Sequence, residues 1–305
     1  MRALRWGRSA YETDEALDLE EAGLAALGVP LVRHEGPDPP LHGVGVLVVT
    51  SKVEVRAEVV AAAPDLELVV TTTSGYEHLD LDTLQSAGVR AARCPIARRD
   101  AVVDTSLALA LSLLRGLPGL HREAERGVWA RGQLPSRAPG LVSGLDVGLV
   151  GLGVIGRAAA HAWRSLGAKV RWHDPALAGS LDLEELVGAS RVVSLHCGHT
   201  DSSDGLVDAT LCRAMRPGTL LVNTARGGCV VLDDVLEADH LGGLGLDVFD
   251  LEPPERLAEI AARPNTVLLP HAAGYHPGLG RAVADEVVAT VEAFLDGRAL
   301  PAALE

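Results

Sequence analysis

Lysine and aromatic residues are scarce in this sequence. Lys52 and Lys169 are the only lysines, and Phe, Trp and Tyr together make up 3% of the 305 residues. Asp and Glu number 41 against 27 Lys and Arg, which gives a formal net charge of −14. Because a surface of this sign repels phosphate backbones, we expect no nucleic-acid partner.

Long apolar runs and paired cysteines are missing as well. No stretch of about eighteen apolar residues could span a bilayer, and the segment from Met1 to Trp6 has no signal-peptide core. The cysteines form no CxxC pair and are scattered along the chain: Cys94, Cys197, Cys212 and Cys229. The sequence therefore predicts neither a disulfide framework nor a metal site, and favours a cytoplasmic protein without membrane contact.

Short apolar runs alternate with segments of helical periodicity. This alternation predicts an α/β fold with parallel sheets, and a length of 305 residues favours two domains. In the first half we expect strands at 43–50, 66–73 and 89–93, and helices at 53–63, 81–87 and 101–115. A segment rich in Gly, Pro and Arg, 116–145, is expected to be loop with one short helix. In the second half we expect strands at 145–150, 169–173, 191–196, 219–223, 243–247 and 266–269, and helices at 154–166 and 278–295.

A glycine-rich turn follows the first strand of the second half. The segment Gly151-Leu152-Gly153-Val154-Ile155-Gly156 lies between a predicted strand and a predicted helix. Its glycines allow a tight turn, a close approach of the backbone to a pyrophosphate and close helix–strand packing, while the helix N-terminus offers free N–H groups. Arg157 could add a phosphate contact. This context predicts a dinucleotide site, whereas the motif alone would also fit an ordinary tight loop.

An acidic residue ends the next predicted strand. Asp174 lies in His173-Asp174-Pro175, roughly twenty residues after the glycine turn. A carboxylate at this place can accept hydrogen bonds from the ribose hydroxyls and repels a 2′-phosphate, so we expect NAD rather than NADP. A turn Asp before proline is the alternative, and the sequence leaves open whether NADP is also accepted.

Three further segments place polar side chains just beyond predicted strands. Arg226 lies in NTARGG, Glu252 in GLDVFDLEP and His271 in LPHAAG. Ligands of open parallel sheets bind at the carboxyl ends of strands, so these side chains could share one site. Arg can clamp a carboxylate, His can protonate a carbonyl oxygen as hydride reaches the carbon, and Glu can orient the imidazole. Singly, they also fit a surface ion pair, a loop histidine and a turn acid.

Together these motifs resemble the D-isomer-specific 2-hydroxyacid dehydrogenase family. In the family's order and spacing, the chain contains GLGVIGR, HDP, VSLHC, RPGTLLVNTARGG, GLDVFDLEPP and LPHAAG. The resemblance covers nearly the whole chain. It implies two Rossmann-like doubly wound parallel-sheet domains: a discontinuous substrate domain, residues 1–100 and 275–305, and an NAD-binding domain, residues 101–274. It also implies NAD as cofactor, a small 2-keto or 2-hydroxy acid as substrate, and a homodimer.

Carried over by position, the resemblance implies roles for individual residues. Arg226 would bind the substrate, and His271 would be the general acid/base with Glu252 as its partner. Asp247 would hold the nicotinamide carboxamide. Backbone amides of Ser74 and Gly75 would bind the substrate carboxylate, beside Arg226 and His271. The residues expected at the cofactor are Gly151, Gly153, Val154, Ile155, Gly156, Arg157, Asp174, Cys197, Thr224, Ala225, Arg226, Asp247, His271 and Gly274.

One segment departs from the family pattern. Where the family commonly has Asn-x-Pro-Gly, this chain has Arg93-Cys94-Pro95-Ile96, and Arg98 replaces a later Asn. The resemblance implies a hinge loop that faces the cleft. One hypothesis is therefore that Arg98 or Arg99 contacts a second anionic group of the substrate or an NAD phosphate, and the alternative is a solvated pair on the hinge. His78 stands where Asn is usual, and fits either a second titrating group or a hydrogen-bonded loop histidine.

Other functions stay open at this point. A family member could act on an unusual substrate such as phosphite or 3-phosphoglycerate. A corepressor-type member would bind NADH and act through protein partners, although no partner-binding extension is visible. The last predicted helix ends close to Glu305, so we expect no serine-binding regulatory domain. The motifs favour NAD-dependent hydride transfer involving a small D-2-hydroxy acid, without naming the acid or the physiological direction.

Overall fold

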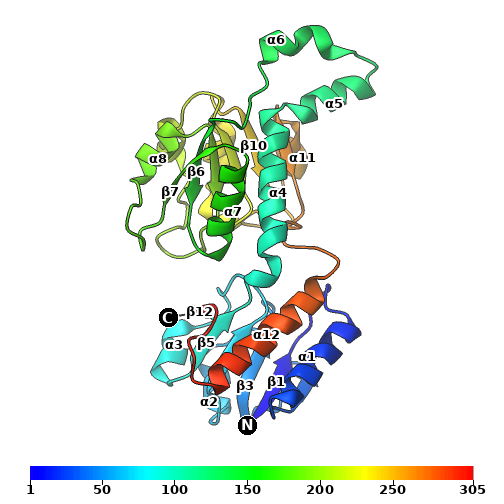
Figure 1. Cartoon of the computed structure of the whole chain (residues 1–305), viewed down its shortest axis with the longest axis vertical. Helices are drawn as coiled ribbons and strands as arrows, with labels where there is room; N and C mark the ends of the chain where they lie inside the picture. Colours follow the sequence, from blue (N-terminus) through cyan, green and yellow to red (C-terminus); the bar gives the residue numbers. More distant parts are fainter. Residues whose placement is uncertain (305) are drawn as a thin grey trace. The chain divides into compact units, whose positions relative to one another are not determined.

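The computed structural model describes residues 1–304 and divides into two compact units. Unit 1 combines Met1–Arg98 with the segment that begins at Tyr275, and unit 2 comprises Arg99–Gly274 (Figure 1). Each unit contains a six-stranded, mainly parallel sheet with helices on both faces, which confirms the expected fold class. Glu305, the last residue of the expected substrate domain, lies outside the described residues.

The sheet of unit 1 has the strand order β12-β5-β4-β3-β1-β2. β1 lies between β2 and β3, so the chain crosses first to one side of β1 and then to the other. The short β12 runs antiparallel to β5. The strands are β1 (Arg2–Trp6), β2 (Leu31–His34), β3 (Val44–Val49), β4 (Leu68–Thr71), β5 (Arg90–Arg93) and β12 (Ala303–Leu304); the helices are α1 (Asp14–Ala26), α2 (Ala57–Ala62), α3 (Leu81–Ser86) and α12 (Leu279–Leu295).

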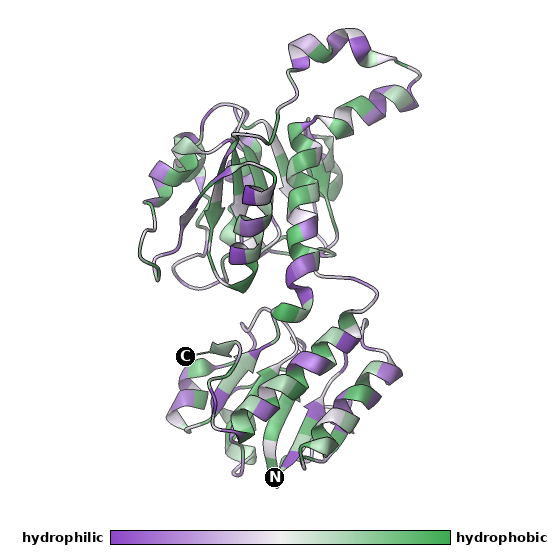
Figure 2. Ribbon diagram, in the orientation of Figure 1, coloured by the Kyte–Doolittle hydropathy of each residue, from purple (hydrophilic) through white to green (hydrophobic). Residues whose placement is uncertain are grey.

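Helices cover both faces of this sheet. On one face α1 and α12 lie side by side, and Leu24 and Val287 belong to the same buried cluster as Val46 (Figure 1). On the other face Leu84 of α3 packs with Leu47. Because neither face meets water, β3 is buried at every position and reads as a continuous apolar run rather than an alternating one (Figure 2).

The sheet of unit 2 repeats this arrangement with the order β11-β10-β9-β8-β6-β7. Its first strand, β6, lies between the second and third strands, β7 and β8. The strands are β6 (Asp146–Val150), β7 (Lys169–His173), β8 (Val192–Leu195), β9 (Leu220–Asn223), β10 (Gly243–Leu246) and β11 (Thr266–Leu268); the helices are α7 (Val154–Ser165), α8 (Leu183–Ala189), α9 (Ala209–Ala214), α10 (Leu232–Glu237) and α11 (Leu257–Ala262).

Two apolar layers hold unit 2 together. Trp163 of α7 and Leu109 of α4 (Ile96–Leu114) are buried against Leu149 on one face. On the other face Leu186 of α8 packs with Leu195 and its neighbours.

Because all six strands of this sheet are parallel, their carboxyl ends share one edge, and the loops that follow the strands lie along it.

Three local expectations were wrong. Residues 96–100 are not a hinge loop but the first turns of α4, because both carboxylate oxygens of Glu286 accept hydrogen bonds from the N–H groups of Ile96 (3.0 Å) and Ala97 (2.7 Å). The helix expected at 53–63 is shorter, because Val55 forms a parallel bridge with Leu79 and delays the start of α2. The segment 116–145 holds α5 (Leu117–Glu125), a 3-10 turn η1 (Ala130–Gln133) and α6 (Leu134–Arg137) instead of one short helix.

The α5–α6 segment extends from the end of α4 away from the sheet of unit 2 (Figure 1). It carries exposed apolar side chains, including Trp129, whose surface is 85% exposed. Among residues 1–304, no single helix is long and apolar enough to cross a membrane; only α4 and α5 taken together, as a pair bent by 66°, meet that criterion of length and composition.

Candidate cofactor and active site

The glycine turn follows β6, the strand that lies between β7 and β8 in the sheet of unit 2. Gly151 has a φ of +89°, and a Cβ there would lie 2.6 Å from the backbone nitrogen of Cys197. A Cβ on Gly156 would lie 2.2 Å from the Gly151 carbonyl oxygen. Both positions therefore require glycine. Gly151 needs it for its positive φ and its contact with Cys197, and Gly156 needs it for the packing of α7 against β6.

Gly153 differs from these two glycines because a Cβ there would meet no atom within 4 Å. It is the N-cap residue of α7 and provides no side-chain hydrogen bond to the first turn. Open space thus lies in front of a helix N-terminus whose N–H groups have no side-chain cap, as a bound pyrophosphate requires. Val154, Ile155 and Arg157 form the first turn of this helix.

Asp174 follows β7 and contacts the glycine turn directly. Its Oδ2 accepts a hydrogen bond from the Leu152 N–H (2.8 Å), and its Oδ1 accepts one from the Ala176 N–H (3.1 Å). Two of the lone pairs of the carboxylate are used in this way, and the others can accept ribose hydroxyls. The structure therefore brings together the turn and the acid that the sequence analysis paired.

Arg226 lies on the turn after β9. The buried Asn223 side chain shapes this turn: its Nδ2 donates to the Arg226 carbonyl (2.9 Å), and its Oδ1 accepts from the Ala225 N–H (3.0 Å). Thr224 between them is buried, and its Oγ1 has no hydrogen-bond partner among the described residues. Sequence reasoning missed Asn223, although an Asn at a strand end before a Gly-rich turn is a recognisable signal.

His271 and Glu252 form a hydrogen-bonded pair at the same edge. His271 Nδ1 and Glu252 Oε2 are 2.8 Å apart, and Glu252 Oε1 accepts the Phe249 N–H at 3.0 Å. A carboxylate on Nδ1 keeps a proton there and leaves Nε2, at the far end of the ring, to exchange protons with a ligand. The imidazole is half exposed, so the pair is open to small molecules.

Asp247 positions the turn that carries His271. Its buried carboxylate accepts the N–H groups of Ala272 (2.7 Å) and Ala273 (3.0 Å), and its carbonyl accepts the His271 N–H (2.8 Å). His271 has a φ of +55°, a left-handed conformation that costs a non-glycine residue about 1 kcal/mol or more. The contacts of Asp247 offset this strain. A contact with the nicotinamide carboxamide stays a prediction.

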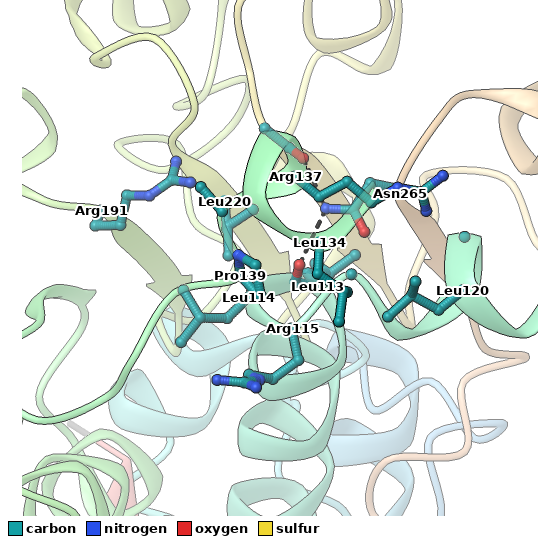
Figure 3. A pocket seen from close by; sticks show the side chains of 14 residues that line it. Leu113, Leu114, Arg115, Leu120, Leu134, Arg137, Pro139, Arg191, Leu220 and Asn265 are labelled. Carbon is teal, nitrogen blue, oxygen red and sulfur yellow. Dashed lines mark hydrogen bonds between the residues drawn. The ribbon is translucent and has the colours of Figure 1, made fainter. Parts of the chain in front are cut away.

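A largely apolar cavity of about 580 Å³ adjoins the His271–Glu252 pair. Its walls include Phe249, Pro254 and Leu257. Apolar walls beside a proton-transfer group limit the access of water and strengthen nearby electrostatic interactions. At the far end of the strands lies a separate cavity of about 320 Å³, where Asn265 donates to the Leu113 carbonyl at 3.2 Å (Figure 3).

The carboxyl edge of unit 2 thus carries open space before a helix N-terminus, the Asp174 carboxylate, a guanidinium and an imidazole–carboxylate pair. Residues 107–273 match the family model for the NAD-binding domain of D-isomer specific 2-hydroxyacid dehydrogenases. The chain belongs to this family.

Individual dehydrogenases extend the similarity beyond unit 2. The chain is 30% identical to D-3-phosphoglycerate dehydrogenase of Mycobacterium tuberculosis over 94% of its own length, but spans only 57% of that protein. It is 30% identical to a glyoxylate/hydroxypyruvate reductase of Arabidopsis thaliana over 83% of this chain and 80% of that one. The solved structure of the TT0316 protein from Thermus thermophilus is 31% identical and matches 100% of both chains with a TM-score of 0.78.

Unit 1 presents Ser74 and Gly75 in the loop after β4. The Ser74 carbonyl accepts a hydrogen bond from Arg93 Nη1 (2.9 Å), and the guanidinium stacks on the Tyr76 ring at 5.4 Å. In a trans peptide the N–H points opposite to the carbonyl, so the Gly75 N–H points away from Arg93. Gly75 is buried in unit 1, and binding of a ligand by its N–H stays a prediction.

The two arginines of the atypical segment have different surroundings. Arg98 donates to the Thr72 carbonyl (2.7 Å) and to the Tyr11 hydroxyl, and stacks on the Tyr11 ring. These contacts favour a structural role over a contact with an anionic ligand. Arg99 is paired with Asp100 at 2.7 Å. His78 is buried, with Nε2 2.9 Å from Thr71 Oγ1, which agrees with a hydrogen-bonded loop histidine.

Proposed function

We propose that this protein is an NAD-dependent dehydrogenase that interconverts a small D-2-hydroxy acid and its 2-keto acid. The observation that carries the proposal is the hydrogen bond between His271 Nδ1 and Glu252 Oε2, 2.8 Å long, on the same sheet edge as the glycine turn. A neutral or protonated imidazole oriented by a carboxylate is suited to general acid/base catalysis at a carbonyl or alcohol.

Each residue at the edge has one task in this proposal. Bound NADH supplies the hydride. Arg226 binds the substrate carboxylate and keeps the carbonyl carbon in place. His271 Nε2 donates its proton to the carbonyl oxygen as charge develops there, and in the reverse direction accepts the proton of the alcohol. Glu252 accepts the Nδ1 hydrogen bond and holds the ring in position.

In unit 1, the backbone amides of Ser74 and Gly75 stay predicted ligands of a carboxylate. The named relatives act on small acids: 3-phosphoglycerate in one, and glyoxylate or hydroxypyruvate in the other. We therefore expect a 2-keto acid of two to four carbons, with or without a phosphate, to be the best substrate.

The test mixes each member of a panel of keto acids with a catalytic amount of protein and excess NADH. The oxidation of NADH is measured as the loss of absorbance at 340 nm. The panel contains glyoxylate, pyruvate, hydroxypyruvate, oxaloacetate and phosphohydroxypyruvate. We expect turnover with at least one of them and much less with NADPH. Binding of NADH without turnover of any member would contradict the proposal and favour a binding protein instead.

A cytoplasmic homodimer completes the proposal. The α5–α6 segment exposes the apolar side chains of Leu117, Val128 and Trp129, and contact with a second copy of the chain would bury them. Light scattering of the purified protein should give twice the chain mass, and Trp129→Ser should shift the equilibrium towards monomer. A monomeric wild-type protein at micromolar concentration would contradict this part.

A further inference from the structure

Two of the cysteines meet at the edge that carries the candidate cofactor site. Cys197 lies on the loop after β8, and Cys229 ends the 3-10 turn η2 (Gly227–Cys229) after β9. Because β8 and β9 are neighbours in the sheet, these loops lie next to each other. The two sulfur atoms are 3.9 Å apart, with the Cys197 thiol as donor to Cys229 Sγ.

Both cysteines contact the parts of unit 2 expected to bind cofactor and substrate. The backbone nitrogen of Cys197 is the atom that excludes a side chain at Gly151 in the glycine turn. The Cys229 N–H donates to the Arg226 carbonyl at 3.4 Å. A movement of either cysteine is therefore transmitted directly to the glycine turn or to the Arg226 turn. Cys229 is fully buried and Cys197 is partly exposed, so a reagent reaches the pair from the side of Cys197.

The pair is also chemically distinct from the other cysteines. The hydrogen bond from Cys197 lowers the pKa of Cys229 to about 7, with further support from Ser203, His199 and Arg226. The same hydrogen bond and burial raise the pKa of Cys197. By contrast, burial raises the pKa of Cys212 to about 11. A thiolate is the reactive form of cysteine, so at neutral pH the pair holds the reactive sulfur.

We propose that Cys197 and Cys229 are an oxidisable dithiol, which a hydroperoxide converts to a disulfide that weakens the binding of NADH to unit 2. In the first step the proton of the Cys197–Cys229 hydrogen bond passes to the buried Cys229, and the partly exposed Cys197 sulfur attacks a peroxide oxygen as the thiolate. An S–O bond forms, the O–O bond breaks and hydroxide leaves, which gives a sulfenic acid on Cys197. In the second step the other sulfur attacks the sulfenic sulfur: the S–S bond forms, the S–O bond breaks, and water leaves with the remaining thiol proton. Two thiols are oxidised, and one hydrogen peroxide is reduced to two waters.

The geometry explains why the disulfide affects the site. A disulfide needs about 2.05 Å between the sulfur atoms, so the two side chains and the loops that carry them must adjust from the present S–S distance of 3.9 Å. The glycine turn and the Arg226 turn adjust with them. The effect on NADH rests on the proposed function, whereas formation of the disulfide does not.

Mass spectrometry can test the disulfide independently of activity. Trypsin gives peptide 192–213, which holds Cys197 and Cys212, and peptide 227–256, which holds Cys229. A Cys212→Ser background leaves Cys197 as the only thiol of the first peptide. After treatment with hydrogen peroxide and alkylation of free thiols, we expect these two peptides linked without reduction and separate after dithiothreitol. Failure to link, with both thiols still alkylated or with sulfinic acid on either, overturns the proposal.

NADH fluorescence titration of the same samples tests the consequence. We expect oxidation to raise the NADH Kd of the Cys212→Ser protein about tenfold, with recovery after dithiothreitol. The Cys212→Ser/Cys229→Ser protein should keep its Kd after peroxide. An equal loss in this double variant, or a linked protein with an unchanged Kd, overturns the regulatory effect. If the reduced protein does not bind NADH, the proposed function fails, while the linked peptides still decide the dithiol.

Discussion

The two units of the chain use the same strand order but fill the first crossover differently. In both, the first strand lies between the second and the third, so both have a switch point where a ligand could bind. In unit 2 the crossover is a glycine turn with open space before an uncapped helix. In unit 1, α1 is capped by the Thr13 side chain, and its first turn carries Asp14 and Glu15.

Buried charged side chains also lie beside the first strand of unit 1. Arg5 of β1 is buried and pairs with Glu20 at 2.8 Å and with Glu12. Burial raises the pKa of Glu20, and the nearby guanidinium counters that effect. The first crossover of unit 1 thus carries protein carboxylates, whereas that of unit 2 has open space before its helix. Topology offers a binding place twice in this chain, and the chemistry of one turn decides which of the two is used.

The largest effect is expected at the carboxyl edges. His271→Ala removes the proposed proton donor of unit 2, so kcat should fall by about 10²- to 10⁴-fold while NADH still binds. His78→Gln, the corresponding change to a histidine of unit 1, should alter kcat by less than about tenfold, since His78 is buried beside Thr71. Stopped-flow kinetics and NADH titration measure both. Equal losses of kcat in the two variants would contradict the assignment of proton transfer to the carboxyl edge of unit 2.

The ion cluster of unit 1 gives the next largest effect. Arg5→Met leaves Glu12 and Glu20 buried without their counter-ion, which should lower the free energy of unfolding by about 3–5 kcal/mol. Arg281→Met breaks an exposed pair with Asp285 and should cost less than about 1 kcal/mol. Urea denaturation followed by circular dichroism measures both losses. A small loss for Arg5→Met would mean that water reaches the cluster.

A pH effect is expected in unit 2 from His196. Burial lowers its pKa from 6.5 to about 4. Because its folded pKa is depressed, its contribution to stability is fully present above pH 6.5 and is lost as the pH falls through about 4, a change of about 3 kcal/mol. His196→Gln should flatten this part of the stability curve, and His161→Gln at an exposed site should not. Denaturation at a series of pH values tests the difference.

Cofactor binding can be separated from folding at one glycine. Gly153→Ala introduces a methyl group that meets no protein atom within 4 Å, at a φ of −69°, so stability should hold while the NADH Kd rises about tenfold. Gly28→Ala in unit 1, at a φ of +77°, should instead cost about 1 kcal/mol of stability with no change in Kd. A normal Kd for Gly153→Ala would place the pyrophosphate elsewhere.

The smallest effect concerns the choice of cofactor. Asp174→Asn keeps an acceptor for the Leu152 N–H but removes the charge, so the ratio of kcat/KM for NADPH over NADH should rise about tenfold. Asp182→Asn, at the exposed N-cap of α8, is the matched control and should leave the ratio unchanged. An unchanged ratio in Asp174→Asn would mean that another group reads the ribose.

The sequence predicts the strands of unit 2 better than those of unit 1, for a physical reason. β7 begins and ends at the predicted residues, because its alternating segment KVRWH lies between the turn at Gly167 and the turn at Asp174-Pro175. No prediction was made for β1, α1 and β2, where β1 carries the buried Arg5 and α1 the buried Glu20, nor for the short helices α8 to α11 of unit 2. Buried charges that pair with each other weaken the apolar pattern from which elements are inferred.

The candidate site was predicted in its residue types and in its edge, but not in its detail. Because the ends of parallel strands share one edge, the sequence alone groups Asp174, Arg226 and His271. The start of α4 depends on Glu286, 190 residues from Ile96, and no local pattern contains that contact. Likewise Cys197 and Cys229 lie 32 residues apart, and only the pairing of β8 with β9 brings them together.

The discontinuity of unit 1 has a consequence for synthesis on the ribosome. Residues 99–274 form a compact unit that is complete before α12 has been translated. Until then, β1, β3 and β4 expose the apolar face that α12 covers, and Glu286 is absent from the start of α4. We therefore expect the inserted unit to fold first during elongation, and the outer unit to wait, exposed to chaperones and proteases, until the last part of the chain emerges.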